Sequence, residues 1–170
     1  MPNPQSSQPL TTSLKKWHQK VDRVAVLAIG SPLRGDDGAA GLAVEALEVL
    51  AKDSPARSRL GVFNGETAPE NFTGEIRRFA PSHLIIIDAA ELAEPGLIEL
   101  IEPAAIASNS PASTHRMPMN VLTDYLRVSI GCQVLIIGIG AASRTFGHAP
   151  CQAVKDAAQT VADAIAQSVL

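Results

Sequence analysis

The chain has 170 residues, of which 46% are hydrophobic but only 4% aromatic, and this predicts one domain with a sizeable aliphatic core. Its net charge of -3 and the lack of a long basic run argue against nucleic acid as a partner. No apolar stretch reaches membrane-spanning length, no signal-like apolar run opens the chain, and Cys132 and Cys151 form no CxxC pair. We therefore expect a reduced, cytoplasmic protein with no membrane partner.

The first 22 residues are expected to be a flexible N-terminal extension, followed by a single domain over residues 23–170. The first thirteen residues or so are poor in apolar side chains, which is typical of disorder. Residues 14–21 are interpreted as a short surface helix that docks Trp17 on the domain. The alternative, a helix lying on a membrane surface, fits poorly because the segment is so short.

Residues 24–52 are predicted to form a strand, a sharp glycine-rich loop and a helix, the opening unit of an α/β fold. Gly30 and Gly35 have the spacing of a phosphate-binding loop. However, Asp36 and Asp37 stand where that loop carries its lysine and its serine or threonine. Two carboxylates would repel a polyphosphate, so the loop suits a cation or an amide-bearing partner instead.

The rest of the chain continues this alternation of strands and helices. Strands are predicted over 60–64, 84–87 (ending at Asp88) and 134–139, an edge strand over 96–101, and helices over 70–79, 118–128 and 151–169. We expect a three-layer α/β fold with about five strands, mostly parallel, one antiparallel edge strand, and helices on both faces.

Candidate site residues follow several predicted strands. Asp36 and Asp37 come after the first strand, Asp88 ends the third, and His115 precedes a helix. Ligands bind outside the carboxyl ends of parallel strands, so carboxylates and an imidazole from these segments could form a metal site with open positions.

Structural interpretations of the same residues stay open. One of the adjacent Asp36 and Asp37 is expected to cap the helix that follows, Asp88 could cap a turn, and His115 could be an ordinary surface histidine. The other three histidines, at positions 18, 83 and 148, are interpreted as such surface residues. Cys151 is expected to have a packing role.

An ordered set of motifs resembles the family of hydrogenase maturation endopeptidases, which trim the C-terminal tail of the large subunit of nickel-iron hydrogenases. The similarity runs from about Val24 to the C-terminus and rests on GSPLRGDDG (30–38), APEN (68–71), LIIIDA (84–89), THRMPM (114–119) and PCQAVKDA (150–157). The set is similar above all to the branch that acts on formate-hydrogenlyase-type or related hydrogenases.

This resemblance implies that Asp37, Asp88 and His115 are the metal contacts, and that the metal is nickel already inserted in the precursor. Other divalent ions are also expected to fit the site. It further implies a monomeric, aspartic-type endopeptidase with Asp37 and Asp88 as catalytic residues, and Asp36 as a further candidate. The partner is then the precursor of the large subunit. The mechanism stays open between a carboxylate that acts as general base and nickel that polarises the scissile carbonyl.

Two positions depart from the family pattern. Ser31 replaces the usual asparagine, and Gly140 stands where the family often has a glutamine or glutamate. One alternative to a peptidase is a nickel-binding maturation chaperone without peptidase activity. Another is a nucleotide-binding domain, which the negative charge of the acidic loop disfavours.

Overall fold

A five-stranded mixed sheet forms the centre of the part of the chain that the computed structural model describes, residues 4–19, 22–105 and 118–170. The strand order is β2-β1-β3-β5-β4, in which β4 alone runs antiparallel, against β5. The strands are β1 Val24–Ile29, β2 Leu60–Asn64, β3 His83–Ala90, β4 Ile98–Ile101 and β5 Gln133–Gly140. This confirms the predicted α/β fold with its antiparallel edge strand.

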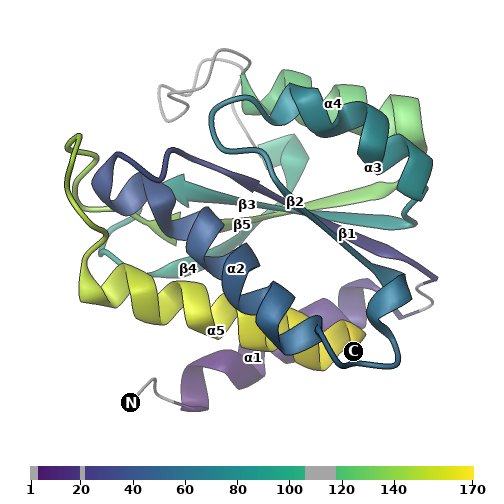
Figure 1. Ribbon diagram of the computed structural model, residues 1–170, viewed down its shortest axis with the longest axis horizontal. Helices are drawn as coiled ribbons and strands as arrows, with labels where there is room; N and C mark the ends of the chain where they lie inside the picture. The colour runs from purple at the N-terminus through teal and green to yellow at the C-terminus, as the bar shows by residue number, and fades with distance from the viewer. Residues whose placement is uncertain (1–3, 20–21, 106–117) are drawn as a thin grey trace.

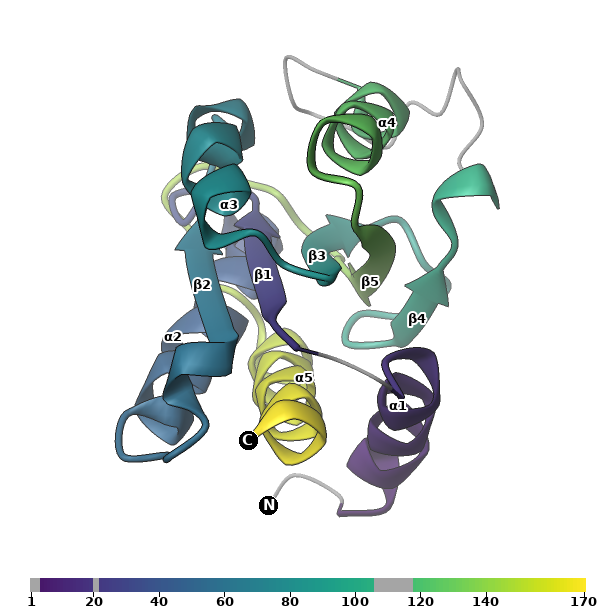
Figure 2. The same cartoon turned by 90° about the vertical axis from the view of Figure 1, so that its right-hand side faces the viewer.

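Helices cover both faces of the sheet (Figures 1 and 2). One face carries α1, α2 and α5, and the other carries α3 and α4. The α-helices are α1 Pro4–Trp17, α2 Ala39–Ala51, α3 Thr73–Phe79, α4 Met119–Ile130 and α5 Gln152–Val169, and the 3₁₀ turns are η1 Gly35–Gly38, η2 Arg57–Arg59, η3 Pro69–Phe72 and η4 Pro103–Ala105. Among the described residues, no helix has the length and apolar character needed to cross a bilayer.

The central strands are apolar on both sides because each side packs against helices. Every residue of β1 is buried. Alternate residues contribute to two separate cores, since successive side chains of a strand point to opposite faces. Val24, Val26 and Ala28 face α2 and α5, and Ala25, Leu27 and Ile29 face α3 and α4.

Helix α1 corrects the expectation of a flexible extension. Leu14 is fully buried and Leu10 is nearly so, and both belong to the core that α5 helps to form. The Thr11 hydroxyl lies 3.4 Å from Oε1 of Gln167 on α5. The prolines and polar residues of this segment disfavour an isolated helix. The apolar stripe is nevertheless stabilised by tertiary packing that composition does not reveal.

His18 is not a surface histidine, because only 6% of it is exposed. The Trp17 ring makes an edge-to-face contact with His83, with centroids 4.8 Å apart. Burial lowers the pKa of both His18 and His83, so both histidines favour the neutral form more than a free imidazole does. This aromatic cluster joins the end of α1 to the start of β3. His148 is exposed, as predicted.

Truncation of Leu14 tests whether α1 belongs to the cooperative fold. Leu14→Ala should lower the free energy of unfolding by about 2–4 kcal/mol, because it leaves a cavity against α5. The measurement is chemical denaturation followed by circular dichroism. Leu50→Ala is the matched control, since Leu50 also lies on a helix but is 43% exposed. Equal losses in the two variants would contradict the docking of α1.

Candidate functional site

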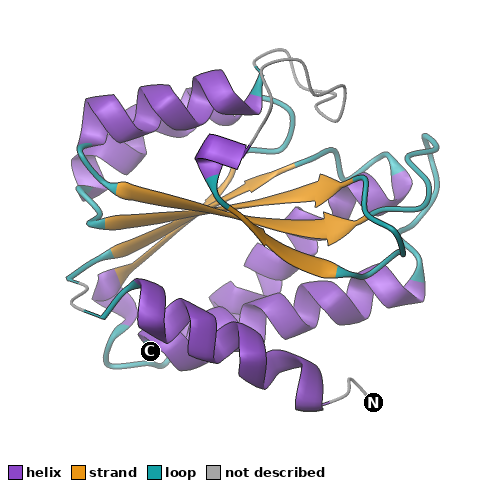
Figure 3. Ribbon diagram, turned by 180° about the vertical axis from the view of Figure 1, so that it is seen from behind, coloured by secondary structure: helices purple, strands orange, loops and turns teal. Residues whose placement is uncertain are grey.

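The site is built on the loop that follows β1 at the carboxyl edge of the sheet (Figure 3). Gly30 leaves the strand with φ of 135°, a conformation that L side chains rarely adopt. A Cβ at this position would collide with the carbonyl oxygen of Asp37. Glycine therefore lets the η1 turn fold back over the end of β1, and this places Asp37 above the sheet edge.

Asp37 is buried, and contacts on each of its carboxylate oxygens orient it. Oδ2 accepts a hydrogen bond from the backbone N–H of Ser31 at 2.8 Å. Oδ1 faces the guanidinium of Arg144, whose Nε lies 3.4 Å away. One oxygen is thus held by the backbone of its own loop, and the other is paired with the side chain of Arg144.

Asp36 points to a different part of the molecule, the loop between β5 and α5. Oδ2 accepts the N–H groups of Ala142 and Ser143 at 2.8 and 3.0 Å, and Oδ1 accepts the N–H of Cys151 at 2.7 Å. Burial alone would raise the pKa of Asp36, but these hydrogen bonds outweigh it and the pKa lies below its ordinary value. The carboxylate is therefore firmly held in its ionised form.

The expectation that Asp36 or Asp37 caps the following helix is wrong. Neither α2 nor η1 has a side-chain cap. The carboxylate of Asp36 instead meets the start of α5, more than a hundred residues away in the chain. The packing role expected for Cys151 is also wrong, because this residue is exposed.

Asp88 lies at the same edge of the sheet as Asp37. It is 9% exposed and pairs in register with Ile29, the residue before Gly30. By strand alternation its side chain is on the face of β3 that carries Ile86, toward α3 and α4. Helix α4 ends at Ile130, just before β5 begins at Gln133, so it starts toward the carboxyl edge. His115 lies outside the described residues.

Arg144 was missed by the sequence reasoning, although it lies in a loop that leaves a strand at the edge where ligands bind. Besides Asp37, its guanidinium contacts the carbonyl oxygen of Ala89, 3.2 Å from Nη2, and Oε1 of Glu91, 3.6 Å from Nη1. It therefore bridges the loop after β1 and the end of β3.

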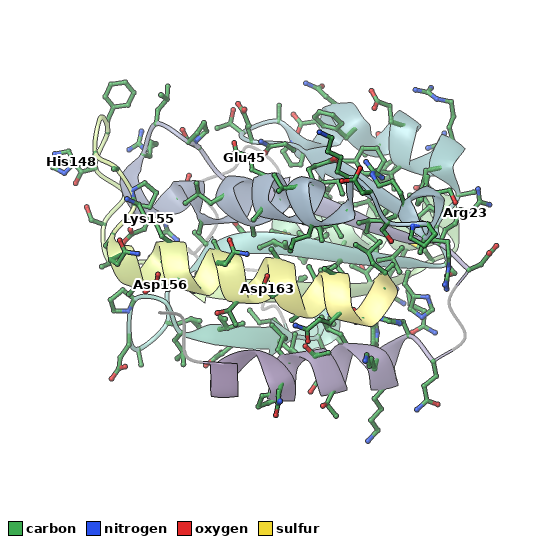
Figure 4. All side chains as sticks on the ribbon, turned by 60° about the horizontal axis from the view of Figure 1, so that its bottom comes forward. Arg23, Glu45, His148, Lys155, Asp156 and Asp163 are labelled. Atoms are coloured by element: carbon green, nitrogen blue, oxygen red, sulfur yellow. The ribbon has the colours of Figure 1, made fainter. Side chains whose placement is uncertain are left out.

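The β5–α5 loop, which carries Arg144, also carries His148. In Figure 4, His148 lies at the opposite end of the molecule from Arg23, which precedes β1.

Gly140 is the last residue of β5. Its N–H donates to the carbonyl of Leu97 at 2.8 Å, and its carbonyl accepts from Gly96 at 2.9 Å. A Cβ at Gly140 would collide with the carbonyl oxygen of Glu94. The backbone at Glu94 lies so close to residue 140 that no side chain fits there, which accounts for the glycine.

The arrangement brings two of the three expected metal contacts to one edge and adds a cation beside them. Within residues 4–19, 22–105 and 118–170, no group of three or more metal-ligating side chains occurs. Carboxylates at such an edge can ligate a hard or borderline cation or accept a proton from water. Arg144 supplies the balancing positive charge.

Comparisons with known proteins agree on one relationship. Residues 43–169 match the family profile described as hydrogenase maturation protease (HycI), a span that includes Asp88 and Arg144. The chain is 36% identical over 137 residues to the hydrogenase 3 maturation protease of Escherichia coli K12, which covers 80% of this chain and 84% of that protein. It is 29% identical over 121 residues to a putative hydrogenase maturation protease of Methanocaldococcus jannaschii, covering 69% of this chain and 71% of that protein.

Solved structures show the same likeness. The crystal structure of the NiFe hydrogenase maturation protease HycI from Thermococcus kodakarensis superposes with a TM-score of 0.82 at 25% identity, covering 92% of this chain and 98% of that one. The solution structure of the endopeptidase HycI from Escherichia coli superposes with a TM-score of 0.71 at 35% identity, covering 83% of this chain and 87% of that one.

Replacement of Asp36 tests its role as an anchor. Asp36→Asn should lower the free energy of unfolding at pH 7 by about 3 kcal/mol, since it removes an ionised acceptor from three partly buried hydrogen bonds. Folding lowers the pKa, so this contribution is present above the unfolded pKa of about 3.9 and is lost as the pH falls through the folded value. The difference from the parent protein should therefore shrink as the pH drops below about 4.

The measurement is urea denaturation from pH 7 down to the acid limit of folding. Asp124→Asn is the control, because the Asp124 side chain is 71% exposed and should change stability by less than about 0.5 kcal/mol. A difference between Asp36→Asn and the parent protein that is the same at every pH would exclude an ionised anchor.

Proposed function

Because this chain belongs to the hydrogenase maturation protease family, we propose that it cleaves the C-terminal extension from the nickel-loaded precursor of a NiFe-hydrogenase large subunit. Its membership of this family makes the protein a peptidase. The observation that carries the substrate assignment is the pair of buried carboxylates at one sheet edge, Asp37 after β1 and Asp88 at the end of β3.

In this proposal the nickel belongs to the substrate. Asp37, Asp88 and His115 contact the ion while the precursor holds it through its own ligands. The in-register pairing of Asp88 with Ile29 supports the approach of the two carboxylates to one ion. The start of α4 at the same edge supports His115 as third contact, because only a few residues separate it from that helix.

The proposed chemistry is carboxylate-assisted hydrolysis by Asp37 or Asp88. One carboxylate takes a proton from water, the water oxygen bonds to the scissile carbonyl carbon, and the C–N bond breaks as the amine regains a proton. We assign no catalytic role to Asp36. Both of its oxygens accept backbone hydrogen bonds, and these make it a weak base.

Discrimination between loaded and empty precursor follows from this arrangement. A loaded precursor brings a cation that the two carboxylates can contact, and an empty precursor lacks that attraction and binds less tightly. The enzyme would then act only after metal insertion.

Processing assays test the proposal. Asp37→Ala and Asp88→Ala should each lower the rate of precursor cleavage at least about a hundredfold while the variants stay folded, because each loses a group that contacts the reacting substrate. His115→Ala should lower the rate of precursor cleavage by a similar factor. The substrate is purified large-subunit precursor, nickel-loaded or nickel-free, and the readout is its mass.

Asp124→Ala is the matched control and should process at the parental rate, since Asp124 lies exposed on α4. Cleavage of nickel-free precursor at the loaded rate would contradict recognition of the metal. An unchanged precursor mass combined with nickel binding would favour a chaperone without peptidase activity.

A further inference from the structure

The guanidinium of Arg144 occupies the position beside Asp37 where a substrate-borne cation would have to arrive. It lies 3.4 Å from Oδ1 of Asp37, the oxygen that accepts no backbone hydrogen bond from the described part of the chain. It also reaches the carbonyl of Ala89, the residue that follows Asp88. The positive charge is therefore already provided at the point where two of the proposed metal-contacting segments meet.

The contacts of Arg144 are long for charge-assisted hydrogen bonds. The distances are 3.2 Å to Ala89, 3.4 Å to Asp37 and 3.6 Å to Glu91, whereas strong guanidinium–carboxylate bonds are about 2.7–2.9 Å. Among the described residues, Nε of Arg144 has no hydrogen-bond acceptor in good geometry. Its attraction to Asp37 is thus mainly electrostatic and can be replaced by another cation.

The backbone around Arg144 is held much more firmly than its side chain. Asp36 accepts the N–H of Ser143, and Ser143 in turn accepts the N–H of Asp36 at 2.8 Å. The loop therefore keeps its place while the arginine side chain changes partner. Glu91 offers that second partner, because its Oε1 lies 3.6 Å from Nη1 and its side chain is 67% exposed, against 20% for Arg144.

We propose that Arg144 makes the enzyme selective for metal carried by a docked precursor. Its guanidinium is an internal cation that competes with free divalent metal for Asp37. In the substrate-free enzyme it neutralises Asp37, so isolated ions bind weakly. A nickel ion presented by a docked precursor brings further protein contacts and displaces the guanidinium toward Glu91. This inference rests on the proposed function, in which Asp37 contacts the nickel. Arg144 acts through Asp37 and is a positioning residue.

Metal titration of the purified full-length protein tests the inference without any precursor. Arg144→Met should bind Ni²⁺ about tenfold more tightly than the parent protein, because a competing unit charge is removed from a partly buried site. Arg144→Lys, which restores the charge, should return to an affinity near the parental one. Calorimetry or equilibrium dialysis gives the dissociation constants.

Two further variants separate competition at Asp37 from other effects. The double variant Arg144→Met/Asp37→Asn should not show the tighter Ni²⁺ binding expected of Arg144→Met. Arg127→Met is the matched control, because Arg127 forms a similar pair with Asp124, 3.8 Å apart, on the exposed face of α4. If methionine disturbs the loop, as thermal unfolding would reveal, Arg144→Gln keeps the polarity and should show the same gain.

An Arg144→Met or Arg144→Gln protein that is folded and binds Ni²⁺ no more tightly than the parent would overturn the inference, as would a gain that survives in the double variant. These results are independent of processing. If the parent protein fails to cleave loaded precursor, the proposed function fails, but the competition measured between Arg144 and Ni²⁺ stands.

Discussion

The hydrogen bonds of Asp36 hold together the two loops on which the site depends. One carboxylate accepts three backbone amides from the β5–α5 connection, at 2.7–3.0 Å, and its ionised form is stabilised by them. The neighbouring carboxylate, Asp37, is thereby left facing the sheet edge. Adjacent residues of the same type thus have different partners, since Asp36 binds the β5–α5 connection and Asp37 contacts Ser31 and Arg144.

The parallel sheet supplies the second constraint. Neighbouring parallel strands end at one edge, and the register of β1 with β3 sets Asp88 beside Ile29. Alternation then directs Asp88 to the face that α4 covers. The missing side chain at Gly30 allows Asp37 to fold over the same point. Backbone geometry therefore explains why residues some fifty positions apart lie at one edge of the sheet.

Charge balance at this edge gives a physical basis for selecting a metal-bearing substrate. Two buried carboxylates without a cation are costly, and Arg144 lowers that cost in the free enzyme. In the function proposed above, a cation delivered with a protein partner replaces the arginine, because the partner adds binding energy that a free ion lacks. Specificity then arises from the difference between two bound states rather than from tight metal binding.

Local patterns in the chain were sufficient for most of the architecture. Apolar strands, helical stripes and glycine-rich turns depend on near neighbours, and they led to the five strands and to helices close to their observed bounds. The carboxyl-edge rule brought out Asp37 and Asp88 because it needs only strand direction.

Contacts between distant segments decided the remainder. Helix α1 is stable because α5 receives Leu14, and nothing in the first thirteen residues indicates that partner. The target of Asp36, the burial of His18 and the pairing of Arg144 with Asp37 likewise join residues from different parts of the chain. Side-chain pairing of this kind has no periodic signature, since it depends on which loops the folded sheet brings side by side.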